Sequence, residues 1–559
     1  MKIDERFENW INSAWIDEKD KQELLELTDE KEIEDRFYKN LEFGTGGMRG
    51  VRGVGTNRIN KYMIGRATQG LANYMLKVDE NSAKKKGVAI AYDCRIGSKE
   101  YALETALVLG ANGIKSFLFK SLRSTPELSF AVRELGCMAG IVITASHNPV
   151  EYNGYKIYWE DGGQIVDPQA SGIVEEVNKI NDLSNVKKIS KKEILDKSLL
   201  NYIDEKIDDK YIEEIKKQVI NKDIPGKENY KIVYTPLHGT GRVGVQRILL
   251  ECGFENIYTV PSQEMPDGEF TTCAYANPED SKVFKLGIEL AEDKKANIVM
   301  ANDPDADRVG IAIKSESGEW IYPNGNQVGL LLMNYILENK KDIPKNAKVI
   351  STIVSTPMLD IVAKDKNVGV IRTLTGFKYI GEKIREFEEG KIEGEFLFGF
   401  EESYGYLIGT HARDKDGIIS AMLIGEMAAY YNFLGLSLED KLDELYKKYG
   451  YYMESLTAIK KEGKEGLEEI ENIMKNLRDN PPKEINNIKV KKIKDYSLPS
   501  DLPMSNVIQI ILEDNTYITI RPSGTEPKIK YYYGVNGKTK EEAENKLKEL
   551  NNKILNINY

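Results

Sequence analysis

The sequence predicts an α/β fold in which three similar α/β units with mixed sheets are arranged around a cleft, followed by a smaller C-terminal α+β domain. The chain has 559 residues, which is too long for a single hydrophobic core. Hydrophobic residues make up 41% of the chain, enough to fill several cores. Apolar, strand-like runs alternate with helical stretches, and this alternation is typical of βαβ units.

The N-terminal region is expected to begin with helices and continue into a glycine-rich loop. Residues 1–40 are polar and have the spacing of amphipathic helices. Residues 42–60 contain six glycines together with Arg49, Arg52 and Arg58. Because this segment follows a helix and not a strand, it is not a dinucleotide-binding fingerprint. An anion-binding loop and a plain mobile loop both fit its composition.

Each of the three α/β units should end an apolar strand in a polar loop. The expected strands and helices lie at 87–95, 100–113 and 141–149 in the first unit, at 230–241, 243–253 and 296–308 in the second, and at 347–359 and 394–406, with a helix between them, in the third. Sequence identity among the units is slight, so the repetition is a hypothesis about architecture.

The C-terminal region has a different composition. Residues 455–500 are rich in Lys and Glu, and they include a helix that the run Asn480-Pro481-Pro482 should end. A strand, a loop, a second strand and a last amphipathic helix should follow. The predicted domains are 1–205 with the Gly/Arg loop, 206–320, 321–445 and the C-terminal α+β domain 446–559.

Charge and cysteine content restrict the classes of function. The formal net charge is −11, which argues against nucleic acid as the main partner but leaves room for an anionic small molecule. The four cysteines form no CxxC pair, so a structural zinc site or a disulfide framework is not expected. The polar N-terminus does not resemble a signal peptide, and the longest apolar runs are too short to span a bilayer. We therefore expect a cytoplasmic protein that binds no membrane.

Ser146 is the first candidate for chemistry. It lies in the segment IVITASHNP, just past the end of an apolar run. The carboxyl ends of strands in an open α/β sheet are the usual place for reactive side chains. His147 is adjacent, but no Gly-x-Ser-x-Gly elbow surrounds the serine.

The segment DPDADR is a candidate metal site. It places Asp303, Asp305 and Asp307 at alternate positions after an apolar strand. Three carboxylates this close repel one another unless a cation neutralises them, and oxygen ligands suit Mg²⁺ or Ca²⁺. The EF-hand pattern fails, because Arg308 and Lys314 occupy its glycine and glutamate positions. A Mg²⁺ site open to a substrate phosphate fits better than a solvated acidic turn.

Three more loops have residue types that suit a sugar phosphate. The segment RPSGTEP offers Arg521, Ser523, Gly524 and Thr525, which suit a phosphate cradle and an ordinary hairpin turn equally well. The segment GFEESYGY offers Glu401 and Ser403 for sugar hydroxyls, although a glycosidase pair or a surface turn also fits. Lys378, in TGFKYIG, is either a site residue or a solvated lysine at a helix start.

Taken together, TASHNP, DPDADR, GFEESYG and RPSGTEP resemble the four active-site loops of the α-D-phosphohexomutase superfamily. They occur in the family's order, and the resemblance covers nearly the whole chain. The forms GTGGMRG, TGFKYIG and GFEESYGY are similar to the branch of bacterial phosphoglucomutases that also includes phosphopentomutase-like enzymes. They differ from the GEMSGH form of dual phosphomannomutase/phosphoglucomutases.

The resemblance implies an isomerase that interconverts glucose 1-phosphate and glucose 6-phosphate, with glucose 1,6-bisphosphate as intermediate and activator. It implies that Ser146 is a phosphoserine and that Mg²⁺ joins it to the three aspartates. It further implies roles in charge neutralisation, proton transfer and substrate binding for Arg49, His147, Lys156, Arg308, Lys378, Glu401, Ser403, Arg521, Ser523, Gly524 and Thr525.

Several alternatives remain open on the sequence alone. A phosphomannomutase or phosphopentomutase would share every motif. A phosphatase would need no serine carrier, a glycosidase would need no phosphate loop, and a non-catalytic sugar-phosphate sensor could retain all the binding loops. The sequence does not decide between monomer and dimer, between Lys528 and Lys530 as a further phosphate contact, or which group is the general acid or base.

Overall fold

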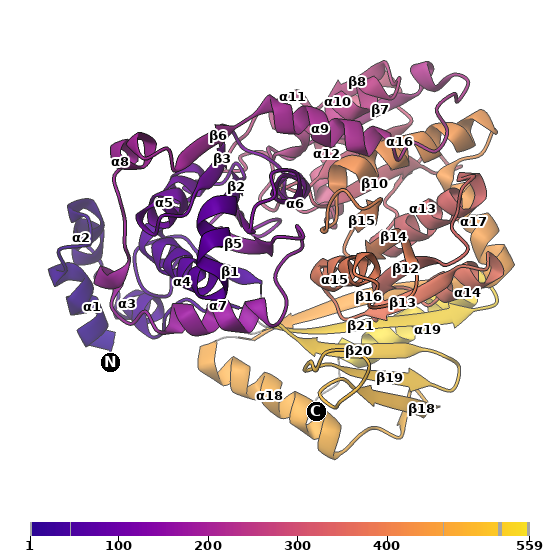
Figure 1. The fold of residues 1–559 in the computed structure, drawn as a ribbon. Coiled ribbons are helices and arrows are strands. Elements are labelled where there is room, and N and C mark those ends of the chain that lie inside the picture. The colour runs from indigo at the N-terminus through magenta and orange to yellow at the C-terminus, as the bar shows by residue number, and fades with distance from the viewer. Residues whose placement is uncertain (1–2, 45, 462, 524–527, 556–559) are drawn as a thin grey trace.

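The computed structural model describes residues 3–44, 46–461, 463–523 and 528–555. Four sheets follow one another along the chain, and the fourth lies below the other three in the view of Figure 1. The first, third and fourth sheets fall within predicted ranges, and the second runs one residue past its range, because its last strand ends at Ile321. The boundaries between domains remain a prediction. Three α/β units with mixed sheets and a different C-terminal unit confirm the predicted fold class.

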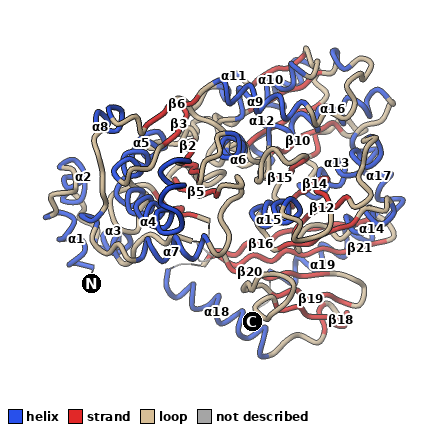
Figure 2. Tube along the Cα trace, in the orientation of Figure 1, coloured by secondary structure: helices blue, strands red, loops and turns tan. Residues whose placement is uncertain are grey.

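The first sheet combines parallel and antiparallel strands in the order β1-β5-β4-β2-β3-β6. Its strands are β1 (Gly47–Val51), β2 (Val88–Tyr92), β3 (Ser116–Phe119), β4 (Ala139–Ile143), β5 (Tyr152–Trp159) and β6 (Leu200–Ile203). The helices up to β6 are α1 (Ile3–Asn12), α2 (Glu18–Leu25), α3 (Glu30–Phe37), α4 (Lys61–Lys86), α5 (Ser98–Ala111), α6 (Thr125–Glu134), α7 (Gln169–Asn178) and α8 (Lys191–Asp196). The helices α1 to α3 form a group of their own at the N-terminal edge (Figure 2).

The glycine-rich segment is ordered by strand pairing. Strand β1 lies within it and pairs antiparallel with β5. Gly47 has a φ of +133°, and a Cβ there would lie 1.9 Å from the carbonyl oxygen of Tyr155. Only glycine allows this close approach of the two strands. The alternative of a plain mobile loop is therefore wrong for Gly47–Val51, and the strand fixes the position of Arg49.

The second and third sheets repeat the mixed pattern. The second has the order β11-β10-β9-β7-β8 and the third β13-β12-β14-β15. The second contains β7 (Lys231–Thr235), β8 (Asn256–Thr259), β9 (Ile298–Asn302), β10 (Val309–Lys314) and β11 (Trp320–Ile321), with helices α9 (Glu205–Lys216), α10 (Gly241–Glu251), α11 (Pro261–Glu264) and α12 (Lys285–Lys294). The third contains β12 (Ala347–Thr352), β13 (Gly369–Thr373), β14 (Glu395–Glu401) and β15 (Gly405–Ile408), with helices α13 (Gly325–Asn339), α14 (Met358–Asp365), α15 (Phe377–Glu388), α16 (Gly417–Phe433) and α17 (Leu438–Tyr449).

One hydrophobic core joins the second and third units and extends into the first. Helix α16 is almost entirely buried and packs against α10 of the second unit as well as against β15. Among the described residues, no single helix is long and apolar enough to cross a membrane. The pair α16 and α17 passes that test only jointly, with a bend of 85° between the two helices.

The fourth sheet is antiparallel throughout. It contains β16 (Tyr451–Lys460), β17 (Glu484–Ile485), β18 (Ile488–Asp495), β19 (Ile508–Leu512), β20 (Tyr517–Pro522) and β21 (Lys528–Gly537), with helices α18 (Gly463–Asp479) and α19 (Lys540–Leu555). Helix α19 packs against β16 and β21. The segment RPSGTEP connects β20 to β21, so Arg521 lies in β20 and faces Lys530 in the strand register.

Candidate active site

Ser146 occupies a strained loop directly after a buried strand. Strand β4 is fully buried, and Ser146 follows it with a φ of 51°, in the left-handed region. The side chain of Thr144 accepts a hydrogen bond from the Ser146 N–H at 2.8 Å. The buried Arg95 guanidinium donates to the carbonyl oxygens of Ser146 at 2.6 Å and of Pro149 at 2.8 Å. These contacts hold the serine in a conformation that a non-glycine residue rarely adopts.

The Ser146 hydroxyl reaches the second unit. Its Oγ donates to Oδ2 of Asp303 at 2.8 Å. Asp303, Asp305 and Asp307 are all completely buried in the loop between β9 and β10. The tertiary structure therefore brings the predicted serine and the predicted carboxylate cluster into direct contact.

The three aspartates form a site that could hold a metal ion. One ligand atom from each of them lies within 4.8 Å of the others. The buried Oδ1 atoms of Asp305 and Asp307 have no hydrogen-bond partner among the residues that the structure describes. Unpartnered buried carboxylate oxygens are costly unless a cation or water completes them. The donor set consists of oxygen atoms alone, as Mg²⁺ prefers.

The pKa values within the cluster differ because only some of the carboxylates have cationic partners. Burial, followed by the charges of Asp307 and Asp305, raises the pKa of Asp303 well above its usual range. Burial also opposes ionisation of Asp305, but the charge of Lys156, hydrogen bonds with Asp303 and Lys156, and the charge of Lys415 together outweigh it and lower that pKa. A divalent cation would favour the ionised form of all three carboxylates.

Two lysines neutralise part of the cluster. Lys156, on β5, places its Nζ 2.7 Å from Oδ2 of Asp305 and 3.4 Å from Oδ2 of Asp307. Lys415 places its Nζ 2.8 Å from the same oxygen of Asp307. Lys156 was predicted as a site residue, whereas Lys415 was missed, because nothing in the segment HARDKDG distinguishes it from a solvated lysine.

The segment 303–307, called the metal loop below, is also held by a residue of the first unit whose role could not be predicted from the sequence. Thr125 begins α6 and donates its hydroxyl to Oδ2 of Asp305 at 2.8 Å. Its N–H donates to the carbonyl oxygen of the same aspartate at 2.9 Å. Arg308 donates its N–H to Oδ1 of Asp303 at 3.0 Å, and its guanidinium pairs with Glu279.

His147 and Arg49 lie at the Ser146 loop. Nδ1 of His147 is 3.1 Å from the Ser146 Oγ, and Arg49 donates to Oδ1 of Asn148 at 2.9 Å. Burial, with the charges of Arg308 and Arg49, lowers the pKa of His147 well below its usual value. The imidazole is therefore neutral at pH 7. A phosphoryl group on Ser146 would oppose this shift, since an anion favours the imidazolium.

The predicted sugar-binding carboxylate is buried at the end of β14. Oε1 of Glu401 accepts a hydrogen bond at 2.7 Å from the N–H of Gly376, which immediately precedes α15. Burial raises the pKa of Glu401 to about 7, although Lys415 opposes the shift. Ser403 lies half-buried in the following turn. The neighbouring Glu402 serves a different purpose, since its carboxylate accepts from the hydroxyls of Thr352 at 2.9 Å and Ser355 at 3.3 Å.

The remaining predicted residues contribute positive charge. Lys378 is half-buried near the start of α15, and burial, assisted by the charge of Arg521, lowers its pKa. Burial also lowers the pKa of Lys530, and the charges of Arg521 and Arg308 add to that effect. The charge of Lys530 also contributes to the lowered pKa of His147. Ser523 lies half-buried after β20, whereas Gly524 and Thr525 are outside the described residues.

The family is shown by comparison with known proteins. Residues 40–184, 209–318 and 324–449 match phosphoglucomutase/phosphomannomutase alpha/beta/alpha domains I, II and III. The chain is 37% identical over 515 residues to a phosphoglucomutase from Staphylococcus haemolyticus, covering 90% of this chain and 92% of the relative. It is 35% identical over 541 residues to one from Staphylococcus saprophyticus, covering 94% and 96%.

Solved structures share the fold. A phosphoglucomutase/phosphomannomutase family protein from Burkholderia thailandensis superposes with a TM-score of 0.67 at 17% identity, covering 92% of this chain and 96% of that one. The open form of parafusin, a phosphoglucomutase from Paramecium, gives a TM-score of 0.67 at 18% identity, covering 91% and 94%. The matched domains and the phosphoglucomutase relatives identify an enzyme of the phosphosugar-mutase type. The chain belongs to the phosphoglucomutase/phosphomannomutase family of the α-D-phosphohexomutases.

Proposed function

We propose that this enzyme is a phosphoglucomutase that interconverts glucose 1-phosphate and glucose 6-phosphate through a phosphoserine at Ser146. The observation that carries the proposal is the 2.8 Å contact of the Ser146 Oγ with Asp303 in the three-aspartate cluster. A serine beside a candidate divalent-metal site can carry a phosphoryl group, which neither a glycosidase nor a simple binding protein requires. The Staphylococcus relatives named phosphoglucomutase support the choice of glucose.

Mg²⁺ is the proposed cofactor, and Asp303, Asp305, Asp307 and Ser146 would hold it. When bound, Mg²⁺ supplies positive charge that stabilises a phosphoryl group during transfer. The two unpartnered aspartate oxygens fit this role. Lys156 and Lys415 supply two positive charges against three carboxylates, so negative charge remains for a cation to neutralise.

Two half-reactions account for the isomerisation. In the first, the bond between the Ser146 oxygen and phosphorus breaks, and the free hydroxyl of the sugar phosphate forms a new bond to phosphorus. The product is glucose 1,6-bisphosphate, the proposed intermediate and activator. After this intermediate turns over in the site, Ser146 accepts its other phosphoryl group, and the second sugar phosphate leaves.

Lys378 is the better proposed proton acceptor for the attacking sugar hydroxyl. Its pKa is lowered by burial, so an unprotonated amine is more accessible than for a solvated lysine. Arg49, the other group implied by the resemblance, carries a guanidinium that is a poor proton acceptor. We therefore assign Arg49 to orienting the Ser146 loop through Asn148 and to neutralising phosphate charge.

Glu401→Gln is expected to raise KM for both glucose 1-phosphate and glucose 6-phosphate by about tenfold. The amide keeps the shape of the carboxylate but loses the charge-assisted hydrogen bonds to sugar hydroxyls, which both bound orientations would use. Steady-state kinetics in both directions measures this.

With wild type, activity should rise as the pH passes upward through about 7, because Glu401 ionises there.

Glu402→Gln is the matched control for Glu401. Its carboxylate is held by Thr352 and Ser355, so we expect a change in melting temperature with little change in either KM. Equal KM increases in the two variants would contradict the assignment of Glu401 as the sugar acceptor.

Arg521→Ala is expected to raise KM for the sugar phosphate by about tenfold or more, since it removes a bidentate charge-assisted contact with the phosphate that is not reacting. Mg²⁺ affinity should stay unchanged, because Arg521 belongs to the fourth unit. Arg478→Ala is the control, as that arginine lies on α18 of the same unit and pairs with Asp495. An Arg521→Ala enzyme with normal KM, or with weakened Mg²⁺ binding, would show that this loop has another role.

A substrate panel tests the choice of glucose. We expect the highest kcat/KM with glucose 1-phosphate, compared with mannose 1-phosphate, ribose 1-phosphate and deoxyribose 1-phosphate. A preference for mannose or a pentose would instead assign the chain to phosphomannomutase or phosphopentomutase activity. Release of inorganic phosphate as the main product would identify a phosphatase.

A further inference from the structure

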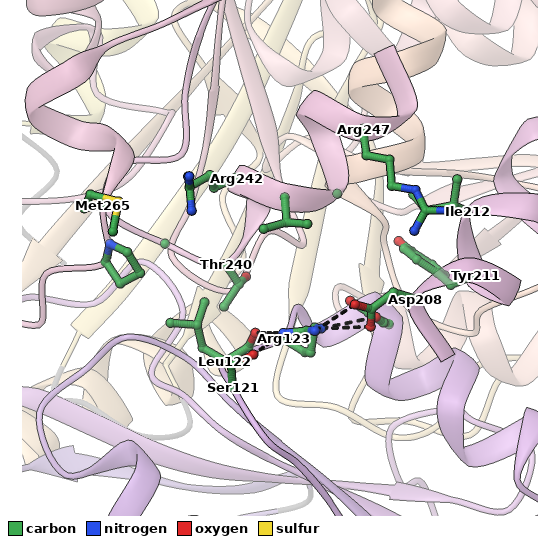
Figure 3. A pocket seen from close by; sticks show the side chains of 15 residues that line it. Ser121, Leu122, Arg123, Asp208, Tyr211, Ile212, Thr240, Arg242, Arg247 and Met265 are labelled. Carbon is green, nitrogen blue, oxygen red and sulfur yellow. Dashed lines mark hydrogen bonds and ion pairs between the residues drawn. The ribbon is translucent and has the colours of Figure 1, made fainter. Parts of the chain in front are cut away.

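A cavity of about 220 Å³ lies between the first and second units (Figure 3). It is next to the metal loop, because its lining residue Thr240 is hydrogen-bonded to Pro304 of that loop. One wall is the segment from Ser121 to Arg123 together with Glu127 of α6. The opposite walls are α9, the start of α10 and Met265. Neither Ser146 nor any of the three aspartates lines it, so it is separate from the proposed catalytic site.

Two buried side-chain oxygens of residues that line this cavity have no hydrogen-bond partner in the described part of the chain. They are the Oγ1 of Thr240 and the Oε1 of Glu127, in residues that are only 7% and 6% exposed. Thr240 is also the N-cap of α10, and its side chain does not cap the helix. The first-turn N–H groups of a helix have no partner within the helix and favour an anion.

The remaining lining combines apolar surface with guanidinium groups. Leu122, Ile212, Val243 and Met265 provide the apolar contacts. Arg123, Arg242 and Arg247 also line the cavity, and each is paired with a carboxylate. Arg123 is held at 2.9 and 2.7 Å by both carboxylate oxygens of Asp208, Arg242 lies 3.1 Å from Glu264, and Arg247 lies 2.7 Å from Glu251. Burial, followed by a hydrogen bond with Asp208 and the charge of that residue, raises the pKa of Glu127 well above its usual value, which favours its neutral form. Its Oε1 lies 3.6 Å from Nε of Arg123.

We propose that this cavity is an effector site for a small organic phosphate or phosphonate with a compact apolar body. The anionic group would accept hydrogen bonds from the start of α10 and from the Thr240 hydroxyl. The apolar body would contact Leu122, Val243 and Met265. The cavity volume suits a molecule the size of a single substituted ring.

The elements around the cavity also support the metal loop from both sides. The Thr240 N–H donates to the carbonyl oxygen of Pro304 at 2.8 Å, and Gly239 packs directly against Pro304. Thr125, two residues before Glu127, holds Asp305 through the two hydrogen bonds described above. An occupant that fixes α10 and α6 would therefore stiffen the metal loop and tighten Mg²⁺ binding. This coupling rests on the proposed Mg²⁺ site, whereas binding at the cavity does not.

Calorimetric titration with phenylphosphonate tests the binding site. We expect one site per chain, a dissociation constant raised tenfold or more in Val243→Trp, and a similar loss in Thr240→Val. Val78→Trp is the matched control, because the two valines are 55% and 52% exposed and Val78 lies on α4. Arg521→Ala should bind phenylphosphonate as wild type does, which excludes the catalytic site as the location measured.

The binding proposal is overturned if wild type does not bind phenylphosphonate or Val243→Trp binds it normally. It is also overturned if neutral benzyl alcohol binds as tightly, or if binding is lost in Arg521→Ala. Melting temperatures establish that the variants fold, and the partly exposed Val243→Trp decides the question should Thr240→Val not fold.

Titration of Mg²⁺ with and without phenylphosphonate tests the coupling. We expect phenylphosphonate to tighten Mg²⁺ binding about fivefold or more, and Mg²⁺ to tighten phenylphosphonate binding by the same factor. Equal affinities with and without the partner would overturn the coupling. Because neither titration measures turnover, a chain that binds phenylphosphonate but lacks mutase activity would contradict the proposed function alone.

Discussion

Ser146→Ala is expected to lower mutase turnover on the order of 10⁴-fold or more, the largest effect among the predicted variants. The hydroxyl that would carry the phosphoryl group is absent, and no neighbouring group replaces it at the 2.8 Å contact with Asp303. Intact-protein mass spectrometry should find one phosphoryl group on wild type and none on the variant. A coupled assay with glucose 1-phosphate and added glucose 1,6-bisphosphate measures the loss of rate.

Ser198→Ala is the matched control for this variant. Ser146 and Ser198 both have a left-handed backbone, with φ values of 51° and 54°. Alanine at either position meets the same backbone restriction as serine, so both variants should fold. Ser198 is exposed after α8, and its variant should keep full activity and phosphorylation. Near-normal turnover in a folded Ser146→Ala enzyme would refute the phosphoserine mechanism.

Asp305→Asn is expected to raise the Mg²⁺ dissociation constant by about 10²-fold or more and to lower turnover with it. Loss of an outer partner of a metal site already costs about 10- to 100-fold in affinity, and Asp305 is a proposed direct ligand. The change also removes the carboxylate to which Lys156 is paired at 2.7 Å. Calorimetry measures the affinity, while kinetics at rising Mg²⁺ shows how much of the turnover returns.

Asp293→Asn is the control for the loss of one negative charge in the second unit. It is exposed near the end of α12 and pairs only with a neighbouring lysine. It should bind Mg²⁺ and turn over substrate normally.

EDTA should stop wild-type activity, and Mg²⁺ should restore it. An Asp305→Asn enzyme that works normally without added metal would show that the three-aspartate cluster is not the metal site.

Much of the fold could be predicted from the sequence, because its signals are local. Apolar runs such as 141–143 and 298–302 became β4 and β9, and the periodic apolar residues of 463–479 became α18. Strands whose stability comes from distant partners were missed. Strand β1 lies among glycines and forms only against β5, and β16 is a long, polar, half-buried strand that pairs with β21.

The sequence by itself determined which candidate loops follow strand ends, since Ser146 and the three aspartates come after strands whose apolar character is local. Only the tertiary structure decided which side chains meet. The contacts of Ser146 with Asp303 and of Lys415 with Asp307 join separate sheets. Such contacts depend on how whole sheets and helices pack, and the spacing of residues within one loop contains no information about that packing. For this reason the contacts of Lys415 and Thr125 with the aspartates could not be predicted from the sequence, nor could the cavity next to the metal loop.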